Sequence, residues 1–370
     1  MSEPLLSVEN LRVTFDTDRG VVHAVDGISY TVQPGRTLGI VGESGAGKTV
    51  SSLALLGLTP GPRSRTDGRI MFGGEDLAAL DDAKLRRVRG SDIAMIVQDP
   101  QSALHPLHRV GAQLIEAIRI HRAVSASAAR DRAIDLLELV GIADPHRRVD
   151  AYPHELSAGM RRRAMIAIAL ANGPKLLIAD ELTAGLEVTV QAQILALLED
   201  LQERLELAII FISRDLGLVS EIADEVAVMY AGRIVEQAPI ERIYASPQHP
   251  YTWGLLASIP WLWRLRDDEP APISGLPPSL IDRPSGCHFH PRCPYALDSH
   301  KRIDPRLRPV DGEDQHSVAC LLDAPMRKRI WEGLRSGGTQ QELRKLLDRK
   351  PGSEATPAAA PAPPAPEAGP

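Results

Sequence analysis

The chain has 370 residues, of which 44% are hydrophobic and 24% charged, and its formal net charge is −6. This length predicts one large domain with a smaller one beside it. The acidic balance argues against a nucleic-acid partner, which usually requires a basic face. No apolar run approaches the roughly 20 residues that span a bilayer, and the first residues do not resemble a secretory signal. We therefore expect any membrane role to be peripheral.

The composition and the hydrophobic pattern of the sequence change three times along the chain. Residues from about 5 to 245 alternate short apolar runs with helical patterns, which predicts a layered α/β domain. Residues from about 246 to 325 are rich in Pro and His, contain all three cysteines and predict a small irregular extension. A basic helical segment follows at about 326–350. The Pro- and Ala-rich residues 351–370 predict a disordered tail.

Four apolar runs in the first region predict strands of a parallel sheet, at 36–42, 92–99, 175–181 and 207–215. Polar residues stand at the carboxyl end of each run. Ligands bind at this edge in open α/β sheets. The four strands should therefore bring their polar residues together at one site.

A phosphate-binding loop follows the first of these strands. Its sequence matches the pattern Gly-x-x-x-x-Gly-Lys-Ser/Thr between a strand and a helix. Glycines let successive N–H groups form one concavity for an anion, and the next helix adds its positive end. We expect the lysine to reach the β- and γ-phosphates and the threonine hydroxyl to bind Mg²⁺. The predicted nucleotide-binding residues here are Gly42, Glu43, Ser44, Gly45, Ala46, Gly47, Lys48 and Thr49.

Three polar residues on neighbouring strands complete this predicted site. Asp180 ends the third strand and suits the Mg²⁺ shell, directly or through water. Glu181 could polarise an attacking water in phosphoryl transfer. Gln98 suits a metal- and water-sensing role and is a further candidate metal ligand. Acidic residues at a strand end are common, so they indicate a metal site here only because the phosphate-binding loop is also present.

A second anion-binding helix end is predicted more than a hundred residues later. The segment Leu156, Ser157, Ala158, Gly159 and Met160 opens a strong helical pattern. A serine at a helix N-terminus offers free N–H groups and a hydroxyl. Such a cap is ordinary by itself, and its position between the second and third strands gives it meaning.

Together these motifs resemble the ABC ATPase family over residues of about 5 to 245. They correspond to its Walker A (Gly42 to Thr49), Q-loop (Gln98), signature (Leu156 to Met160) and Walker B (Leu176 to Asp180) motifs. The resemblance implies a P-loop NTPase fold with a RecA-like sheet, an antiparallel β subdomain and a helical signature subdomain at about 100–172. It implies that ATP with Mg²⁺ binds between two cassettes, one providing the P-loop and the other the signature. It places the adenine-stacking aromatic at Phe15.

A narrower resemblance, to the dipeptide/oligopeptide/nickel permease subfamily, covers almost the whole chain. The segments YPHELSAGMRRRAMIA, QHPYTWGLL and GCHFHPRCPYA carry it. It implies an ATPase subunit on the cytoplasmic face of the inner membrane that powers import, with peptide as the expected solute. The implied partners are a second ATPase subunit, two transmembrane permease subunits and an extracytoplasmic solute-binding protein. The permeases would dock near residues 98–106.

Four positions depart from the family pattern around the reaction centre. Arg214 replaces the switch histidine, Glu187 the D-loop aspartate, Ala158 a signature glycine and Leu182 the proline after Glu181. Arg214 is always charged, so it could bond the γ-phosphate or pair with Glu181 and hold it from water. This raises a second hypothesis: the chain binds ATP, hydrolyses it poorly and completes the site of a different partner subunit.

The cysteines also depart from the subfamily. Cys287, Cys293 and Cys320 match three of four cysteines that can hold an iron–sulfur cluster, and Ser299 stands at the expected third position. A nearby histidine could complete a cluster or a zinc site. The candidates for that ligand are His288, His290 and His300. Free thiols are the favoured interpretation.

Other protein classes fit less well. ABC proteins of translation usually carry two cassettes, and those of DNA repair carry long coiled coils; this chain has neither. A kinase or GTPase would leave the signature segment unexplained. A regulatory ATP clamp stays open because of Arg214.

Overall fold

The structure is a computed structural model that describes residues 3–61, 63–98, 103–259, 273–313 and 315–347. Its centre is an eight-stranded sheet with the order β11-β12-β10-β9-β3-β8-β7-β6. The bounds of these strands, in that order, are Arg308–Pro309, Ser317–Val318, Arg233–Pro239, Glu225–Tyr230, Thr37–Val41, Ala208–Ser213, Leu176–Asp180 and Ile93–Ile96. The predicted tail lies outside the described residues.

All four predicted parallel strands are present as β3, β8, β7 and β6, and adjacent ones pair in parallel. Their side chains are mostly apolar because both faces of the sheet are covered. On β7, for example, Leu177 and Ala179 enter one core while Leu176 and Ile178 enter the other. The predicted second strand is shorter than expected and ends at Ile96.

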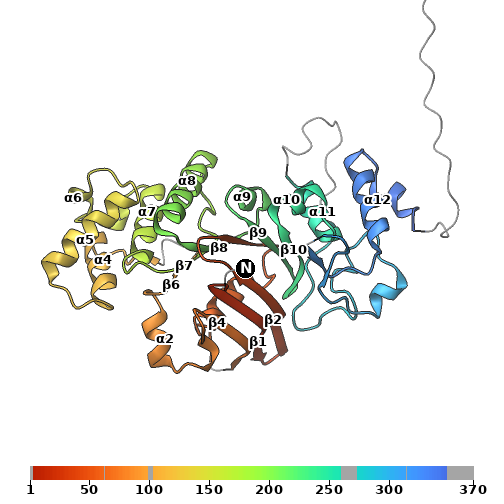
Figure 1. Ribbon diagram of the computed structural model, residues 1–370, viewed down its shortest axis with the longest axis horizontal. Helices are drawn as coiled ribbons and strands as arrows, with labels where there is room; N and C mark the ends of the chain where they lie inside the picture. The colour runs from red at the N-terminus through yellow and green to blue at the C-terminus, as the bar shows by residue number, and fades with distance from the viewer. Residues whose placement is uncertain (1–2, 62, 99–102, 260–272, 314, 348–370) are drawn as a thin grey trace, which may run out of the picture.

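A four-stranded antiparallel sheet covers one face, with the order β2-β1-β4-β5. Figure 1 shows it beneath the central sheet, with the helices that follow β6 at one end of the molecule and the C-terminal residues at the other. The four strands, in chain order, are β1 Leu6–Thr17, β2 Gly20–Val32, β4 Ser64–Phe72 and β5 Glu75–Asp76. This is the antiparallel subdomain that the family resemblance implies.

The helices fall into groups along the chain. Helices α1 Lys48–Leu55, α8 Val188–Leu205 and α9 Leu216–Ser220 follow strands of the central sheet, whereas the 3-10 turn η1 Leu77–Ala79 and α2 Asp82–Val88 follow β5. Those of the predicted helical region are α4 Val110–Arg119, α5 Ala126–Leu139, α6 Pro145–Arg148 and α7 Ala158–Ala169, with η2 Pro153–Glu155. The later ones are α10 Ile240–Ala245, α11 Pro250–Ala257, η4 Asp298–Lys301, α12 Ala324–Arg335 and α13 Gln340–Arg344.

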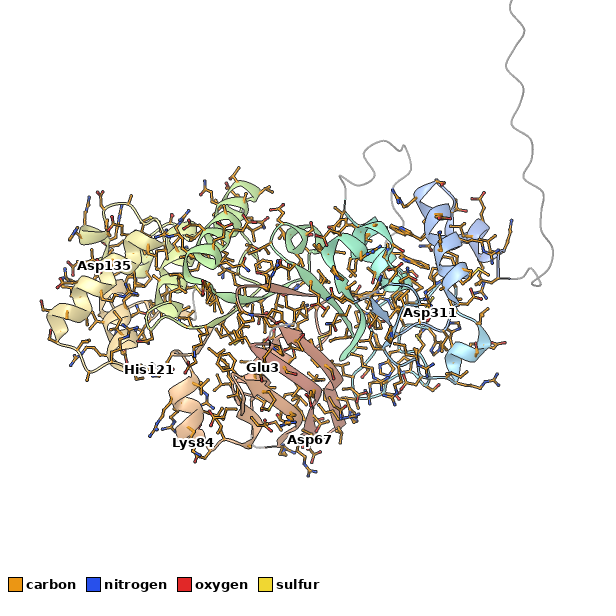
Figure 2. The ribbon with its side chains drawn as sticks, in the orientation of Figure 1. Glu3, Asp67, Lys84, His121, Asp135 and Asp311 are labelled. Atoms are coloured by element: carbon orange, nitrogen blue, oxygen red, sulfur yellow. The ribbon has the colours of Figure 1, made fainter. Side chains whose placement is uncertain are left out.

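Charged side chains lie at the periphery of the molecule. Lys84 on α2, Asp67 on β4 and Asp135 on α5 are all exposed, and Figure 2 shows their side chains at the periphery. None of the helices in the described ranges is both long and apolar enough to cross a membrane.

The segment 246–325, called here the C-terminal extension, is more integrated than the sequence suggested. Its strand β12 pairs with β10 and lengthens the central sheet. Phe289 packs its ring against Tyr230 of β9 and Tyr251 of α11, with centroids 5.2 and 5.5 Å apart. Two-residue strands leave almost no periodicity in a sequence, which is why these were not predicted.

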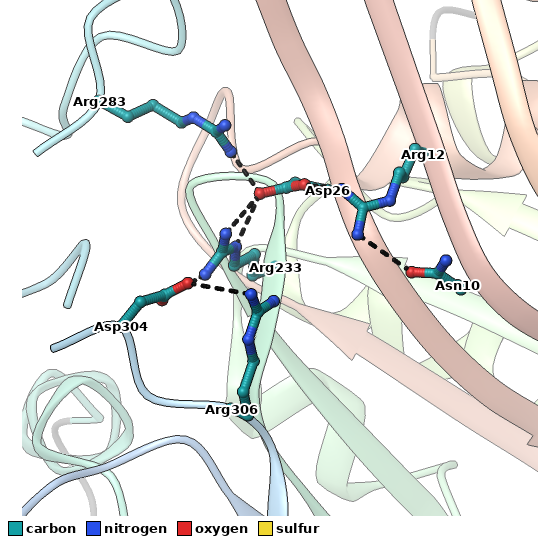
Figure 3. Close-up of polar contacts among 7 residues, drawn as sticks. All are labelled: Asn10, Arg12, Asp26, Arg233, Arg283, Asp304 and Arg306. Carbon is teal, nitrogen blue, oxygen red and sulfur yellow. Dashed lines mark hydrogen bonds and ion pairs between the residues drawn. The ribbon is translucent and has the colours of Figure 1, made fainter. Parts of the chain in front are cut away.

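Ion pairs around Asp26 of β2 fasten the extension to the core (Figure 3). The Asp26 carboxylate lies 2.6 Å from Arg233 of β10, 2.5 Å from Arg283 of the extension and 2.9 Å from Arg12 of β1. Burial would raise the pKa of Asp26, but the hydrogen bonds and charges of Arg233 and Arg283 outweigh it and hold the pKa well below its usual range. The carboxylate therefore stays ionised and paired.

A buried histidine inside the extension should make stability depend on pH. His316 lies 2.8 Å from the Glu236 carboxylate and 2.7 Å from that of Glu313. Burial would lower the pKa of His316, but its hydrogen bonds with these carboxylates outweigh burial and raise it. A histidine whose pKa is raised by folding stabilises the protein fully at pH values below its pKa in the unfolded chain. This stabilisation is lost as the pH rises through its pKa in the folded protein.

We therefore expect the thermal midpoint of the wild type to fall more steeply over the range above about pH 6.5, the ordinary histidine value, than that of His316→Gln. Thermal scans across that range measure this. The exposed His146 provides the control, since His146→Gln should follow the wild type. Identical pH slopes in the wild type and His316→Gln would contradict the assignment.

Candidate functional site

The glycine-rich loop 42–47 joins β3 to α1, and its close packing requires glycine at two positions. A Cβ on Gly42 would stand 2.1 Å from the Met229 carbonyl oxygen. Gly47 has a φ of 101°, and a Cβ there would stand 2.2 Å from the Ala24 carbonyl oxygen. L-residues with side chains rarely adopt this backbone conformation. The loop is thus pressed against β2 and β9.

The hairpin between β9 and β10 fixes the middle of the loop. Its two-residue turn, Ala231 and Gly232, has positive φ at both positions, as a type I′ turn requires. The Gly232 N–H donates to the Ala46 carbonyl at 2.9 Å. An antiparallel hairpin therefore supports a loop that belongs to the parallel part of the sheet.

Lys48 begins α1 and turns its side chain back toward the loop. It is only 4% exposed. Its ammonium donates to the carbonyls of Gly42 at 2.6 Å and Glu43 at 3.0 Å. Burial lowers the pKa of Lys48, and the nearby carboxylates, Glu181 first among them, oppose this shift only in part. The result is a cation held at the helix N-terminus, where anions are favoured.

Asp180, at the end of β7, lies beside this cation and is 1% exposed. Burial raises its pKa, and a hydrogen bond with the Thr49 side chain opposes that shift. One carboxylate oxygen, Oδ1, is buried and has no hydrogen-bond partner among the described residues. A buried carboxylate oxygen without a partner beside a threonine hydroxyl is a donor set that suits Mg²⁺.

Glu181 follows directly and is gripped from two sides. Its backbone has a φ of 46°, and its N–H donates to the Ile212 carbonyl at 2.9 Å. Arg214 donates to both carboxylate oxygens, at 2.7 and 2.9 Å. Gln98 donates to one of them at 2.6 Å. Residues from β7, β8 and the segment after β6 thus meet at one edge of the sheet, where the sequence placed them.

The predicted signature segment begins α7. The Ser157 hydroxyl accepts the Met160 N–H at 3.2 Å and caps the helix. Ser157 and Ala158 are exposed, whereas Leu156 is buried. The start of α7 therefore presents its free N–H groups outward.

Sequence reasoning missed the role of Arg162, four residues into α7. Arg162 is 4% exposed, and its guanidinium donates to the Gln98 carbonyl at 2.9 Å and the Ala184 carbonyl at 3.1 Å. It therefore links the signature helix to the segments after β6 and β7. A run of three arginines in the sequence does not reveal which one faces inward.

The remaining predicted residues lie around this centre. Glu187 is exposed and precedes α8 without a side-chain cap, while Leu182 is fully buried. Phe15 is half-buried on β1 and packs against the core between the antiparallel and central sheets. Of the segment 98–106, residues 99–102 lie outside the described residues.

The cysteines do not fit a metal cluster. All three are free. Burial raises the pKa of each thiol, that of Cys320 to about 12. Within the described residues, no group of three His, Cys, Asp or Glu side chains is arranged to hold a metal ion.

Comparison with known proteins agrees with this geometry. The ABC transporter family model matches residues 25–184, and the model described as the oligopeptide/dipeptide transporter C-terminal region matches residues 235–299. The oligopeptide transport ATP-binding protein OppD of Bacillus subtilis is 47% identical over 325 residues, which cover 87% of this chain and 90% of that protein. The chain belongs to the ABC transporter family. Its second match places it among the oligopeptide/dipeptide-type members.

A second relative and a solved structure support the same family assignment. The dipeptide transport ATP-binding protein DppD of Escherichia coli is 47% identical, covering 86% of this chain and 98% of its own. A solved dimeric ATP-binding cassette, bound to ADP and Pi, has a TM-score of 0.57 at 22% identity and covers 64% of this chain and 98% of its own. That likeness shows the ABC cassette fold.

A stability experiment tests the inward role of Arg162. Arg162→Gln should lower the free energy of unfolding by about 2 kcal/mol, because charge-assisted hydrogen bonds from a buried arginine to two backbone carbonyls are lost. Urea unfolding measures this. Arg119→Gln, at an exposed position of α4, is the control and should change stability by less than about 0.5 kcal/mol. Equal effects would show that Arg162 does not join these segments.

Proposed function

We propose that the chain is the ATP-hydrolysing subunit of a peptide importer. The carrying observation is that Lys48, Asp180, Glu181 and Gln98 meet at the carboxyl edge of one parallel sheet, above the N-terminus of α1. The C-terminal region of the oligopeptide/dipeptide transporter type and relatives named for peptide transport support the solute class. The proposal that the solute is a peptide rests on the similarity to those relatives.

Each residue has a distinct task in this proposal. The loop N–H groups and Lys48 bind the triphosphate, and Phe15 stacks on the adenine. Thr49 and Asp180, with Gln98 nearby, would hold Mg²⁺, which when bound neutralises charge on the phosphates. Glu181 orients the attacking water. The exposed start of α7, from Leu156 to Met160, completes the site of a partner cassette.

The complex we propose contains five proteins: this chain, a second and non-identical ATPase subunit, two permease subunits and an extracytoplasmic solute-binding protein. The chain would sit at the cytoplasmic face of the membrane, with the permeases near residues 98–106. Co-purification from the native host, followed by identification of the subunits, tests this composition.

Substitution of Lys48 tests nucleotide binding. Lys48→Ala should weaken Mg-ATP binding by about 100-fold, because it removes charge-assisted hydrogen bonds to phosphate. Titration calorimetry measures the Kd. Lys175→Ala, which replaces a largely exposed lysine paired with Asp92 at 3.7 Å, is the control and should keep wild-type affinity. Retention of Mg-ATP by Lys48→Ala would refute the proposed site.

The Arg214–Glu181 pair favours a second proposal, that this chain's own site hydrolyses ATP slowly. Both Glu181 oxygens accept hydrogen bonds from Arg214, and the guanidinium keeps its charge at all working pH values because the hydrogen bonds with Glu181 raise its pKa further. A carboxylate so occupied is a poor acceptor for a water proton. The relatives themselves give no support for impairment.

Restoring a histidine tests this second proposal. Arg214→His should raise single-site turnover on the order of tenfold, because Glu181 regains its role as proton acceptor. The assay uses the native complex with the partner's P-loop lysine replaced, so that only this chain's site turns over. Arg204→His, on the exposed side of α8, controls for loss of an arginine. Unchanged turnover would show that Arg214 does not restrain Glu181.

A further inference from the structure

The C-terminal extension reaches into the glycine-rich loop at one residue, Glu43. Arg292 of the extension donates to both Glu43 carboxylate oxygens, at 2.6 and 2.9 Å. Its Nε donates to the Ser274 carbonyl at 2.9 Å, and its side chain is only 5% exposed. Bidentate pairing of this kind fixes orientation as well as charge. A segment that lies about 250 residues away in sequence thus holds the second residue of the loop.

The extension also holds the backbone of the same residue. The Glu43 N–H donates to the Tyr251 hydroxyl at 2.8 Å. Tyr251 is fully buried on α11, where its ring packs against Tyr230 and Phe289. Glu43 therefore has both its side chain and its N–H fixed by groups outside the cassette core.

Glu43 passes this restraint on to Lys48. The Glu43 carbonyl is one of the two acceptors of the Lys48 ammonium, at 3.0 Å. The other acceptor, the Gly42 carbonyl, belongs to the preceding peptide unit. A shift of Glu43 would therefore move the cation on which phosphate binding depends.

The pairing also controls charge. Glu43 is 28% exposed and carries a carboxylate at the rim of a loop that is built for anions. With Arg292 the pair is neutral, whereas without it a negative charge would stand free beside the phosphates. Loss of Arg292 alone should thus harm nucleotide binding more than loss of both partners.

We propose that Arg292 and Tyr251 are positioning residues for nucleotide binding, which makes the C-terminal extension a working part of the ATP site. Arg292 neutralises Glu43 and, with Tyr251, sets the carbonyl that holds Lys48. The inference rests on the proposed function, namely that ATP binds around Lys48.

A double-mutant cycle in the full chain tests it. Arg292→Gln should weaken Mg-ATP binding on the order of tenfold, and adding Glu43→Gln to it should recover affinity to within about threefold of wild type. Tyr251→Phe, which keeps the ring, should weaken binding about threefold. In the native complex the KM for ATP should rise while kcat at saturating ATP stays unchanged.

The matched control is Arg283→Gln, because Arg283 also ties the extension to the core, but through Asp26 (Figure 3). It should leave Mg-ATP affinity unchanged, and thermal midpoints verify that each variant is folded. If Arg292→Gln fails to fold, Tyr251→Phe and Glu43→Gln decide the question through the KM for ATP.

The outcomes separate the two claims. Absence of Mg-ATP binding in the wild type would refute the proposed function. Wild-type binding that is lost in Lys48→Ala but unaltered in the Arg292 and Tyr251 variants would overturn only this inference. The inference would also be overturned if the double variant lost as much Mg-ATP affinity as the two single variants together, or if Arg283→Gln lost as much affinity as Arg292→Gln.

Discussion

The structure depends on the placement of one cation, the Lys48 ammonium, which two carbonyls of its own loop hold at 2.6 and 3.0 Å. That placement requires the loop to be folded tightly against its neighbours. The close approach of Gly42 to the Met229 carbonyl and the bond from Gly232 to Ala46 supply the tightness. The ammonium is buried, so it must be balanced by carboxylates, and Asp180 and Glu181 at the end of β7 provide them. The parallel sheet thus fixes the chemistry by aligning strand ends.

Much of this arrangement could be predicted from sequence because it is local. The four core strands are mostly apolar since both faces are covered, and polar residues stand at or just beyond the carboxyl end of each. The glycine-rich loop and the cap at Ser157 are likewise short-range patterns. Two-residue strands such as β11 and β12 carry too little pattern to be recognised.

Contacts between distant segments could not be predicted. Arg162 points inward and Arg292 reaches Glu43 only because of how α7 and the extension pack. For Arg214 the sequence left two partners open, the γ-phosphate and Glu181, and the structure pairs it with Glu181. Spacing could not decide this, because the choice depends on how closely the ends of β7 and β8 approach. The roles of these residues in catalysis stay predictions.

The extension changes how the cassette is understood. Its family match could suggest an appendage, yet it adds strands to the central sheet, closes an ion-pair cluster on Asp26 and holds the glycine-rich loop. Three separate attachments make it part of the same folded unit. Nucleotide binding and the extension should therefore respond to each other.

Hydrogen–deuterium exchange of the intact chain, with and without Mg-ATP, tests the central claim most directly. If a triphosphate binds in the loop that Lys48 completes, peptides covering residues 42–55 should gain protection, and those covering 287–296 should follow because Arg292 grips Glu43. Residues 126–139 on α5 provide the internal reference and should not change. Unaltered exchange over 42–55 at saturating Mg-ATP would contradict the account.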